Sequence, residues 1–589
     1  MADAPAEQQP LEVFQKWTEI SGRSQQMMME FWAKEQGGAL PSFDPLGAMA
    51  TWQLAMKAAM ADPQKLFALQ TRYMTDAMAL WQSFVIPGSA QSPVPSVKDK
   101  RFANDAWNEA PAFDFLRHSY LLASNYMLEG SKGIEGLDSH EKTRAQFFIK
   151  QFVDAMSPSN FAMTNPEVLK KTAETGGANL LKGLEHMMED LAAGRMKMTD
   201  ENAFEVGRNV AITPGKVVFE NRLFQLIQYS PTTPKVHEIP LLIFPPWINK
   251  FYILDLTAEK SFIRWAVEQG LTVFVTSWKS ADATLADVVL DNYVGEGQIT
   301  ALDTVLEICG TSSAHTIGYC VAGTTLAATL AVLAARGEAA KVATATFFTA
   351  QVDMSECGEL SVFIDPATLE TLDKLTAEQP WLDGRNMAMT FNMLRSNDLI
   401  WSYVVNNYMI GKDYMPFDLL YWNSDATNVP ALWHRSYLTD IYRDNLLVQP
   451  GGITVLGVPV DLTMVATPSY IQGGKEDHIA PARSAYKLTN QFTGEKRFVL
   501  AGSGHIAGVV NPPSMHKYQY WTSDTLPDRF DDFVASAVET KGSWWPDWIA
   551  WLAPRSGKQD AARKPGDGKD GGKYKAIEDA PGRYVKERI

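Results

Sequence analysis

The sequence predicts an α/β fold in which a mostly parallel sheet follows a helical region and is interrupted by an inserted cap. Before residue 199, apolar residues recur at three- and four-residue steps, as on one face of a helix. After it, short apolar strands alternate with helical stretches, which is the pattern of crossover units in a parallel sheet. Residues 354–465 lie between two of these strands and are dense in aromatic side chains, among them Trp433 and Tyr437. A loop of that length without structure is implausible, so we interpret it as a cap.

The composition is that of a globular protein with a sizeable core. Hydrophobic residues make up 46% of the 589 residues, which excludes wholesale disorder. The formal net charge of −15 argues against general nucleic-acid binding, which needs a basic surface. The three cysteines are few and odd in number, so we expect a reducing, cytoplasmic compartment rather than a disulfide framework. We read no signal peptide at the N-terminus.

Residues 1–95 are predicted to be a helical, partly flexible arm that ends in a linker rich in Pro, Gly and Ser. One helical face is marked by Leu11, Phe14 and Trp17, and another by Leu66, Leu69, Tyr73, Ala77 and Leu80. The apolar cluster within 27–32, rich in Met, fits ordinary helix packing or an arm that docks a partner or an apolar particle. Residues 96–198 are predicted to form a helical domain, with helices at 113–128, 141–156 and 178–193.

Residues 199–554 are predicted to form the α/β domain, and residues 555–589 a flexible polar tail. The expected strands are 206–212, 216–219, 223–229, 241–244, 271–277, 314–319, 342–349, 469–472 and 497–500. Helices are expected at 261–269 and 324–336. The uncharged run 316–335 is long enough for a membrane span, but its glycines and threonines favour a strand followed by a turn and a helix. We therefore expect no membrane span.

The strongest chemical signal is the segment HTIGYCVAGT at 315–324. A strand runs into Cys320 and a helix of small residues leaves it, as in a nucleophile elbow. A thiolate there would lie at a helix N-terminus, which favours negative charge. The Val321 N–H is placed to be half of an oxyanion hole. The alternative is a structural Cys buried in a tight turn.

Two further residues follow predicted strands in an order that supports catalysis. Asp477 follows the strand that ends near Gly473, and His505 follows the next strand. Nucleophile, acid and histidine in this chain order are typical of an α/β-hydrolase-like arrangement. His505 would take the thiol proton of Cys320, and Asp477 would orient His505. The loop after the strand at 241–244 would supply the second oxyanion N–H, from Trp247 or Ile248.

Other signals are weaker. His478 adjoins Asp477 and is interpreted as a solvated or supporting histidine. The remaining histidines and cysteines lack metal-ligand spacing, so no metal is expected. Because neither G-x-S-x-G nor a P-loop occurs, a serine hydrolase of the usual kind and a nucleoside triphosphatase are disfavoured.

Several segments together resemble the polyhydroxyalkanoate synthases. They are PPWINKFYILDL at 245–256, GYCVAGT at 318–324, WNSDAT at 422–427, GGKEDHI at 473–479, GSGHIAGVVNPP at 502–513 and GSWWPDW at 542–548. VDAMSPSNFAMTNPE at 153–167 and FEVGRNVA at 204–211 also resemble this family, and the resemblance runs from about residue 100 to the end. Length and the Gly-Tyr-Cys-Val box resemble the class I enzymes, which act on short-chain monomers without a second type of subunit.

The resemblance implies an acyltransferase with Cys320 as acylated nucleophile, Asp477 as triad acid and His505 as general base. The substrate would be an (R)-3-hydroxyacyl coenzyme A, such as the 3-hydroxybutyryl thioester, and the product a polyester. Coenzyme A would be part of the substrate and a released product, so no cofactor is expected. The family also implies a mobile cap, a homodimer and attachment to cytoplasmic polyester granules, where phasin-type proteins are possible partners.

One residue departs from the family pattern, and two other functions compete with the synthase. The family box has a glycine where this chain has Ala322, and the added methyl is expected to fall where strand and helix crowd. A Cys-type thioesterase would use the same triad but admit water. A non-catalytic granule-coat protein would use only the N-terminal helices rich in Met and aromatic residues.

Overall fold

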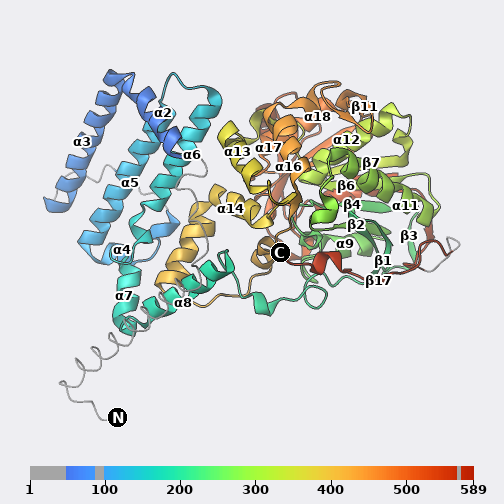
Figure 1. Cartoon of the computed structure of the whole chain (residues 1–589), viewed down its shortest axis with the longest axis horizontal. Helices are drawn as coiled ribbons and strands as arrows, with labels where there is room; N and C mark the ends of the chain where they lie inside the picture. Colours follow the sequence, from blue (N-terminus) through green and yellow to red (C-terminus); the bar gives the residue numbers. More distant parts are fainter. Residues whose placement is uncertain (1–47, 87–93, 95–98, 567–571) are drawn as a thin grey trace, which may run out of the picture. The chain divides into compact units, whose positions relative to one another are not determined.

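The computed structural model describes residues 48–86, 94, 99–566 and 572–589. It divides into two compact units, one of Met1–Thr199 with Thr390–Met415 and one of Asp200–Met389 with Pro416–Ile589. The predictions for Leu11, Phe14, Trp17 and the cluster at 27–32 lie outside the described residues. Figure 1 shows the mainly helical first unit and the sheet of the second.

The first unit is built from helices whose ends follow local sequence signals. Its main helices are α2 (Ala48–Met60), α3 (Pro63–Val85), α5 (Pro111–Lys132), α6 (Ser139–Ala155), α7 (Pro166–Thr175) and α8 (Ala178–Ala193). The Asp62 side chain caps α3 by accepting the backbone N–H of Lys65, and Asp138 with Glu141 forms a capping box on α6. The predicted helices at 113–128, 141–156 and 178–193 are confirmed.

Helix α3 belongs to this helical unit rather than to a separate arm. Leu80 is buried in one cluster with Trp107, Leu121 and Leu122, and the half-buried Tyr73 packs against the same cluster. Tyr73, Ala77 and Leu80 of the predicted helical face therefore form the packing face of α3, whereas Leu66 is exposed. The expected division at residue 95 is not where the described helices separate, because apolar contacts continue across it.

Part of the expected cap joins the helical unit. Residues Thr390–Met415 are grouped with the first unit, whereas the rest of 354–465 is grouped with the second. Asn179 on α8 donates to the carbonyl of Met409 at 2.8 Å, and α8 crosses the Tyr408 backbone at Gly183. No local pattern marks this pairing, because it joins residues far apart in the sequence.

The second unit contains an eleven-stranded sheet in the order β15-β14-β13-β12-β7-β6-β4-β5-β2-β1-β17. The six strands from β13 to β5 are parallel and the flanking pairs are antiparallel. The strands are β1 (Gly215–Glu220), β2 (Phe224–Tyr229), β4 (Leu241–Phe244), β5 (Val273–Trp278), β6 (Ala314–Tyr319), β7 (Val342–Phe348), β12 (Ser469–Gly474), β13 (Lys496–Ala501), β14 (Gln519–Thr522), β15 (Val538–Lys541) and β17 (Glu578–Asp579). The predicted α/β fold is confirmed. The predicted strand at 206–212 is wrong, because only an isolated bridge joins Val206 and Val210.

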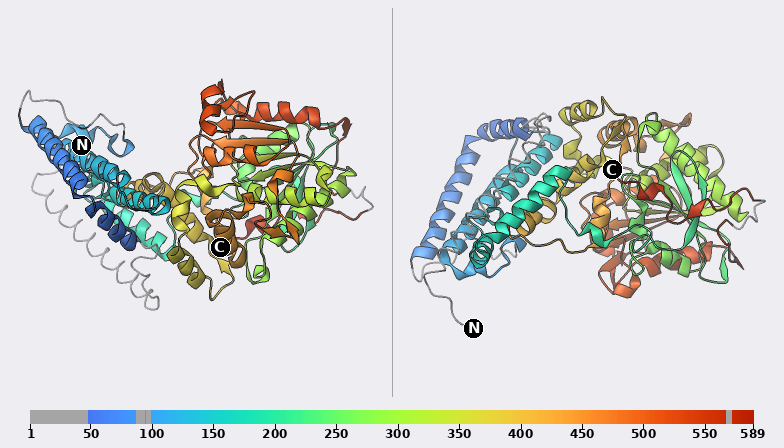
Figure 2. Two further views of the ribbon diagram at one scale, coloured as in Figure 1. Left: turned by 90° about the horizontal axis from the view of Figure 1, so that it is seen from above. Right: turned by 60° about the horizontal axis from the view of Figure 1, so that its bottom comes forward.

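Helices cover both faces of the sheet, so its central strands are buried throughout (Figure 2). Helices α11 (Thr300–Cys309), α12 (Val321–Ala335) and α17 (Ala482–Tyr486) contribute to the apolar cluster on one face. Helices α9 (Phe262–Glu268) and α20 (Trp545–Leu552) contribute to the cluster on the other. In the described part of the chain, no helix is long and apolar enough to cross a membrane.

The C-terminal segment differs from the flexible tail that its polar composition predicts. Strand β16 (Gln559–Ala561) pairs with β3 (Lys235–His237), and β17 pairs with β1 at the sheet edge. Tyr584 and Val585 are buried. Backbone pairing and the buried side chains of Tyr584 and Val585 thus hold the segment in place. Amino-acid composition alone does not predict such pairing.

Replacing Gly183 by alanine tests the pairing of α8 with the segment that contains Tyr408. An added Cβ would overlap the Tyr408 carbonyl, so we expect Gly183→Ala to destabilise the helical unit by about 1–3 kcal/mol. Gly133→Ala is the matched control, because its Cβ would find its nearest neighbour at 3.4 Å, an ordinary contact. Urea unfolding curves measure both variants. Equal midpoints for the two variants would contradict the pairing.

Candidate active site

Cys320 lies at a strained corner between β6 and α12. Its φ of 53° is in the left-handed region, and its N–H donates to the carbonyl of Phe348 at 2.9 Å. A Cβ on Gly318 would lie 2.6 Å from Gly323 Cα, and a Cβ on Gly323 would overlap Ala350. The two glycines are therefore required for strand and helix to approach closely enough to raise Cys320. This geometry is that of the predicted elbow.

The closest approach of strand and helix at the elbow is at Gly318 and Gly323. Ala322, the second residue of α12, is buried in the apolar cluster, and its carbonyl accepts a hydrogen bond from Gln298 at 3.0 Å. The effect of the added methyl group at Ala322 stays a prediction.

Asp477 and His505 meet on the loops after the neighbouring strands β12 and β13. Asp477 Oδ2 lies 2.7 Å from His505 Nδ1. The other carboxylate oxygen accepts the N–H groups of Ile479 and Ala480, each at 2.8 Å. Both oxygens are therefore engaged, and the orientation of the His505 ring is fixed. With Nδ1 bonded to Asp477, Nε2 is the ring nitrogen left for Cys320.

The electrostatics of His505 favour its charged form. Burial opposes the imidazolium, but the negative charges of Asp477 and Cys320, with hydrogen bonds to both side chains, raise the pKa of His505 to about 10. Since the ordinary value is 6.5, the ring keeps its proton between these two pH values. A cationic imidazole beside Cys320 can balance a thiolate there.

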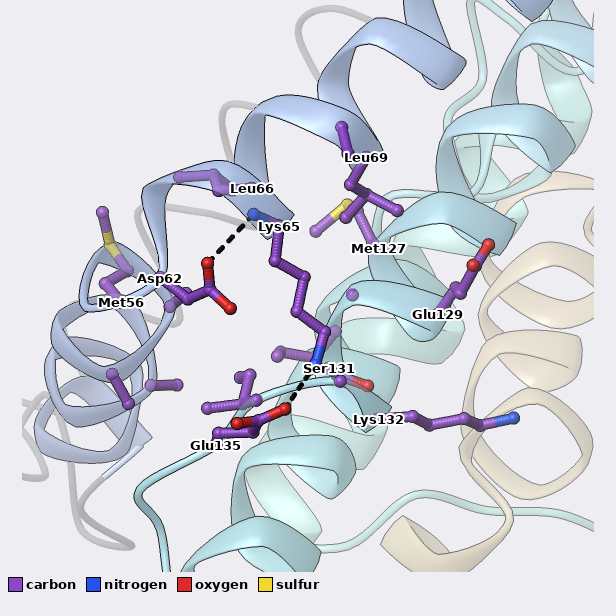
Figure 3. A pocket seen from close by; sticks show the side chains of 18 of the residues that line it. Met56, Asp62, Lys65, Leu66, Leu69, Met127, Glu129, Ser131, Lys132 and Glu135 are labelled. Atoms are coloured by element: carbon purple, nitrogen blue, oxygen red, sulfur yellow. Dashed lines mark hydrogen bonds and ion pairs between the residues drawn. The ribbon is translucent and has the colours of Figure 1, made fainter.

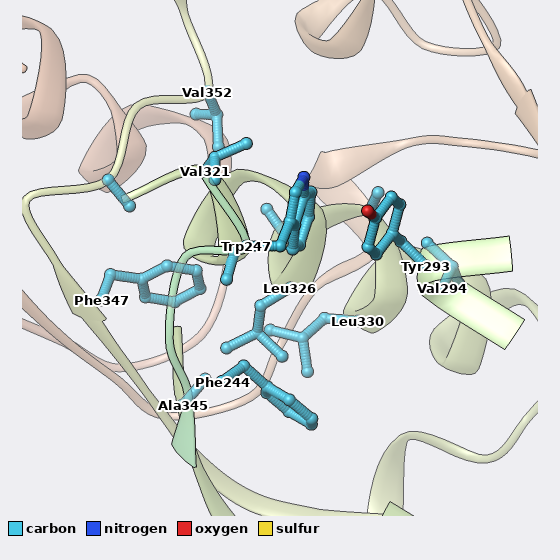
Figure 4. Close-up of a cluster of buried hydrophobic side chains, with 14 of the residues drawn as sticks. Phe244, Trp247, Tyr293, Val294, Val321, Leu326, Leu330, Ala345, Phe347 and Val352 are labelled. Carbon is cyan, nitrogen blue, oxygen red and sulfur yellow. The ribbon is translucent and has the colours of Figure 1, made fainter. Parts of the chain in front are cut away.

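The loop after β4 lies beside the elbow, because Phe244 pairs with Gly318 across the β4–β6 ladder. The Trp247 side chain points into the core, where its ring stacks on Tyr293 at 4.0 Å and lies in the cluster that includes Val321 (Figure 4). Val321 is the first residue of α12, so its N–H has no partner within the helix. The Val321 N–H and the backbone N–H groups of 247–248 stay the predicted donors for an oxyanion.

Two tyrosines of the cap come close enough to Cys320 to interact with its charge. Burial, with the charge of Cys320 as a lesser cause, raises the pKa values of Tyr437 and Tyr442. Tyr437 stacks on Trp433 at 4.9 Å and meets Tyr442 edge-on at 5.3 Å. The aromatic density of the cap pointed to Tyr437, but no motif marks Tyr442. Both tyrosines belong to the π-helix η12 (Tyr437–Arg443) and pack, like Cys320, against the same buried apolar cluster.

Burial dominates the electrostatics of the other two cysteines, although Cys357 lies in the apolar cluster against which Tyr437 and Tyr442 pack. Burial raises the pKa of Cys309 to about 12 and that of Cys357 to about 11, so neither is prepared as a nucleophile. His315 is buried within the sheet, where its ring contacts Thr344 and Ser556. Among the described residues, no three His, Cys, Asp or Glu side chains are arranged to hold a metal ion.

Comparison with known proteins agrees with this architecture. A family model described as "alpha/beta hydrolase fold" matches residues 279–512. The sheet order and the elbow therefore define a protein of the α/β-hydrolase fold with cysteine at the nucleophile position. A second family model, "Poly-beta-hydroxybutyrate polymerase (PhaC) N-terminus", matches residues 98–266.

Curated relatives match most of the chain. "Poly(3-hydroxyalkanoate) polymerase subunit PhaC" of Cupriavidus necator is 47% identical over 531 residues, which cover 89% of each chain. "Poly(3-hydroxyalkanoate) polymerase" of Methylorubrum extorquens is 45% identical and covers 94% of this chain and 93% of the relative. "Poly(3-hydroxyalkanoate) polymerase 2" of Ectopseudomonas oleovorans is 37% identical, covering 84% and 87%. The chain belongs to the poly(3-hydroxyalkanoate) polymerase family, whose members are transferases.

Alkylation of Cys320 tests the site without any substrate. Because His505 supplies both a base and a compensating charge, we expect His505→Gln to slow the reaction of Cys320 with iodoacetamide at pH 7 by roughly tenfold or more. His478→Gln is the matched control and should react like the unaltered protein. Peptide mass mapping measures the rate at each cysteine. Equal alkylation rates of Cys320 in the two histidine variants would contradict the activation of Cys320 by His505.

Proposed function

We propose that this enzyme polymerises (R)-3-hydroxyacyl coenzyme A into a polyester, carries the acyl chain on Cys320 and releases coenzyme A. The observation that carries the proposal is the Asp477–His505 pair. His505 Nδ1 is bonded to Asp477, and the side chain of His505 also hydrogen-bonds Cys320 at the elbow. Membership of the polymerase family supports the choice of reaction. The proposed reaction uses no cofactor, because coenzyme A enters as part of the substrate.

The first step is acyl transfer to sulfur. The proton of the Cys320 thiol resides on His505, whose imidazolium pairs with the thiolate, and this thiolate attacks the carbonyl carbon of the substrate thioester. The Val321 N–H and the 245–250 loop stabilise the oxyanion of the tetrahedral intermediate. The bond to the sulfur of coenzyme A then breaks, and His505 returns the proton to this leaving thiolate. One thioester replaces another, so the step is nearly balanced in energy.

The second step forms the ester bond. The 3-hydroxyl of one unit attacks the thioester of another, and the departing sulfur takes up the proton that the hydroxyl loses. We assign the transfer of this proton to His505, because the Asp477 side chain is 0% exposed and both its oxygens are engaged. Water must be kept from the acyl enzyme, and the half-buried Tyr437 and Tyr442 support such exclusion.

The competing function from the same site is thioester hydrolysis. A Cys-type thioesterase would use the same three residues and admit water in place of the second hydroxyl. The choice for the polymerase rests on the family, and the preference for short chains on the resemblance to the class I enzymes.

Incubation of pure protein with (R)-3-hydroxyacyl coenzyme A of four, six or eight carbons tests the proposed reaction. We expect coenzyme A release together with insoluble polyester, fastest with the four-carbon substrate. Free hydroxy acid without polymer would favour the thioesterase, and no release of coenzyme A would favour the granule-coat protein. Cys320→Ala should abolish polymer formation, because no thiol remains to carry the chain. Polymer made by this variant would overturn the assignment of Cys320.

We also propose that the enzyme is cytoplasmic, forms a homodimer and attaches to polyester granules, with phasin-type proteins as further partners. Support for granule attachment comes from α3, where Phe67, Met74, Met78 and Trp81 are 71%, 60%, 63% and 52% exposed. These residues recur at seven-, four- and three-residue steps and so form one helical face. Helices α2, α3 and α5 also enclose a pocket of 590 Å³, which is lined mainly by apolar groups such as Met56, Leu66, Leu69 and Met127 (Figure 3). An apolar surface of this kind suits an apolar particle.

Charged substitutions on the exposed face of α3 test granule attachment. We expect Phe67→Glu, Met74→Glu and Trp81→Glu together to lower the granule-bound fraction while coenzyme A release continues. The matched control is Gln64→Glu, Gln70→Glu and Thr75→Glu, which adds charge at exposed polar positions of the same helix. Sedimentation with isolated granules measures both. Deleting residues 1–95 is a poorer test, because it would uncover the cluster around Leu80. Equal binding of both variants would remove α3 from the attachment surface.

A further inference from the structure

The 245–250 loop is held from outside by three hydrogen bonds to its carbonyl groups. Pro245 accepts the indole N–H of Trp278 at 2.7 Å, on the neighbouring strand β5. Trp247 accepts the Thr427 hydroxyl at 3.0 Å, and Lys250 accepts the Trp422 indole N–H at 2.7 Å. Two of the three donors thus come from the segment 422–427, which also forms an antiparallel bridge from Ala426 to Asn249.

The bond from Thr427 fixes the direction of one particular N–H group. The peptide unit between Trp247 and Ile248 is planar and trans, so its carbonyl and its N–H point in opposite directions. With the Trp247 carbonyl directed at Thr427, the Ile248 N–H is directed to the other side of the loop. Within the described part of the chain, this N–H donates no hydrogen bond. Of the two sequence candidates for the second oxyanion donor, Ile248 is therefore the one whose orientation is set.

The far end of the loop is anchored to the C-terminus of the chain. Lys250 is 2% exposed, and its ammonium group donates to the carbonyl of Glu587. Burial lowers the pKa of Lys250, which the negative charge of the buried Asp425 partly offsets. A buried ammonium group is costly unless it is hydrogen-bonded, so the Glu587 carbonyl is a needed partner. Tyr584 and Val585, both buried, hold the segment that presents this carbonyl.

We propose that Thr427 and the Lys250–Glu587 contact together position the Ile248 N–H for oxyanion stabilisation, so that the last residues of the chain act on acyl transfer. The inference rests on the proposed function, because the oxyanion arises only if Cys320 accepts an acyl group. An oxyanion donor must be placed to within a few tenths of an ångström before the reaction. A short loop with two prolines and three external hydrogen bonds meets this requirement. Thr427 and Lys250 are positioning residues, since they act through the loop.

The first test removes the Thr427 hydroxyl while keeping the side-chain shape. We expect Thr427→Val to slow single-turnover release of coenzyme A by about tenfold to a hundredfold, with KM nearly unchanged, because the oxyanion forms only after substrate binding. Thr427→Ser restores the donor and should recover most of the rate. A Val variant as fast as the unaltered enzyme, or a Ser variant as slow as the Val variant, would overturn the role of Thr427.

The second test uses two truncations that differ by one residue. A chain ending at Glu587 keeps an acceptor oxygen for Lys250, whereas a chain ending at Lys586 lacks it and places the new carboxylate about 3.3 Å short. We expect the first to acylate like the full chain and the second to lose at least about tenfold in single-turnover rate. Equal rates for the two would overturn the anchor.

The unaltered enzyme separates failure of the inference from failure of the proposed function. If the unaltered enzyme releases no coenzyme A, the proposed function fails and the inference falls with it. If it acylates normally and the variants do too, only the inference fails. Amide hydrogen exchange of residues 247–250 provides a readout without substrate, and faster exchange in Thr427→Val and in the Lys586 truncation is expected. Unchanged exchange in both would contradict the clamp.

Discussion

The site depends on how closely β6 and α12 approach at the elbow. Gly318 and Gly323 leave no room for a Cβ, and their contact forces Cys320 into a left-handed conformation. The strain is local, and the buried strands on both sides of β6 hold it in place. The Cys320 sulfur therefore lies at the N-terminus of α12, beside the 245–250 loop. The carbonyl groups of Trp247 and Lys250 in this loop accept hydrogen bonds from Thr427 and Trp422.

A second constraint is electrostatic. Burial of His505 would by itself lower the pKa of its ring, but the negative charges of Asp477 and Cys320 and the hydrogen bonds to them raise it instead. Asp477 can do so because backbone N–H groups and His505 occupy both of its oxygens. The parallel order β6, β7, β12, β13 brings all three side chains to one edge of the sheet, although they are far apart in sequence.

The sequence was most informative where the determinants are local. The strands of the parallel sheet, the elbow at Cys320 and the strand-end positions of Asp477 and His505 follow from short patterns, since strand burial and turn chemistry act over a few residues. The catalytic roles of these residues stay predictions. The prediction of a strand at 206–212 was wrong, because a run of apolar residues can be buried without pairing in a sheet. The prediction of a flexible C-terminal tail was wrong, because β17 pairs with β1 and Val585 packs in the core, and both of these partners are distant in the sequence. The same reason hid Tyr442, which no motif marks. Thr427 and Lys250 lie in the family-like segments 422–427 and 245–256, but no local pattern shows that they contact Trp247 and Glu587.

The central claim is that the Cys320 sulfur carries the acyl chain, and trapping that intermediate tests it most directly. The enzyme is mixed with labelled (R)-3-hydroxybutyryl coenzyme A, quenched with acid during turnover and digested for mass spectrometry. The account predicts label on the peptide that contains Cys320, bound as a thioester that hydroxylamine releases. Turnover with label on another residue, or with no labelled peptide at any time, would contradict it.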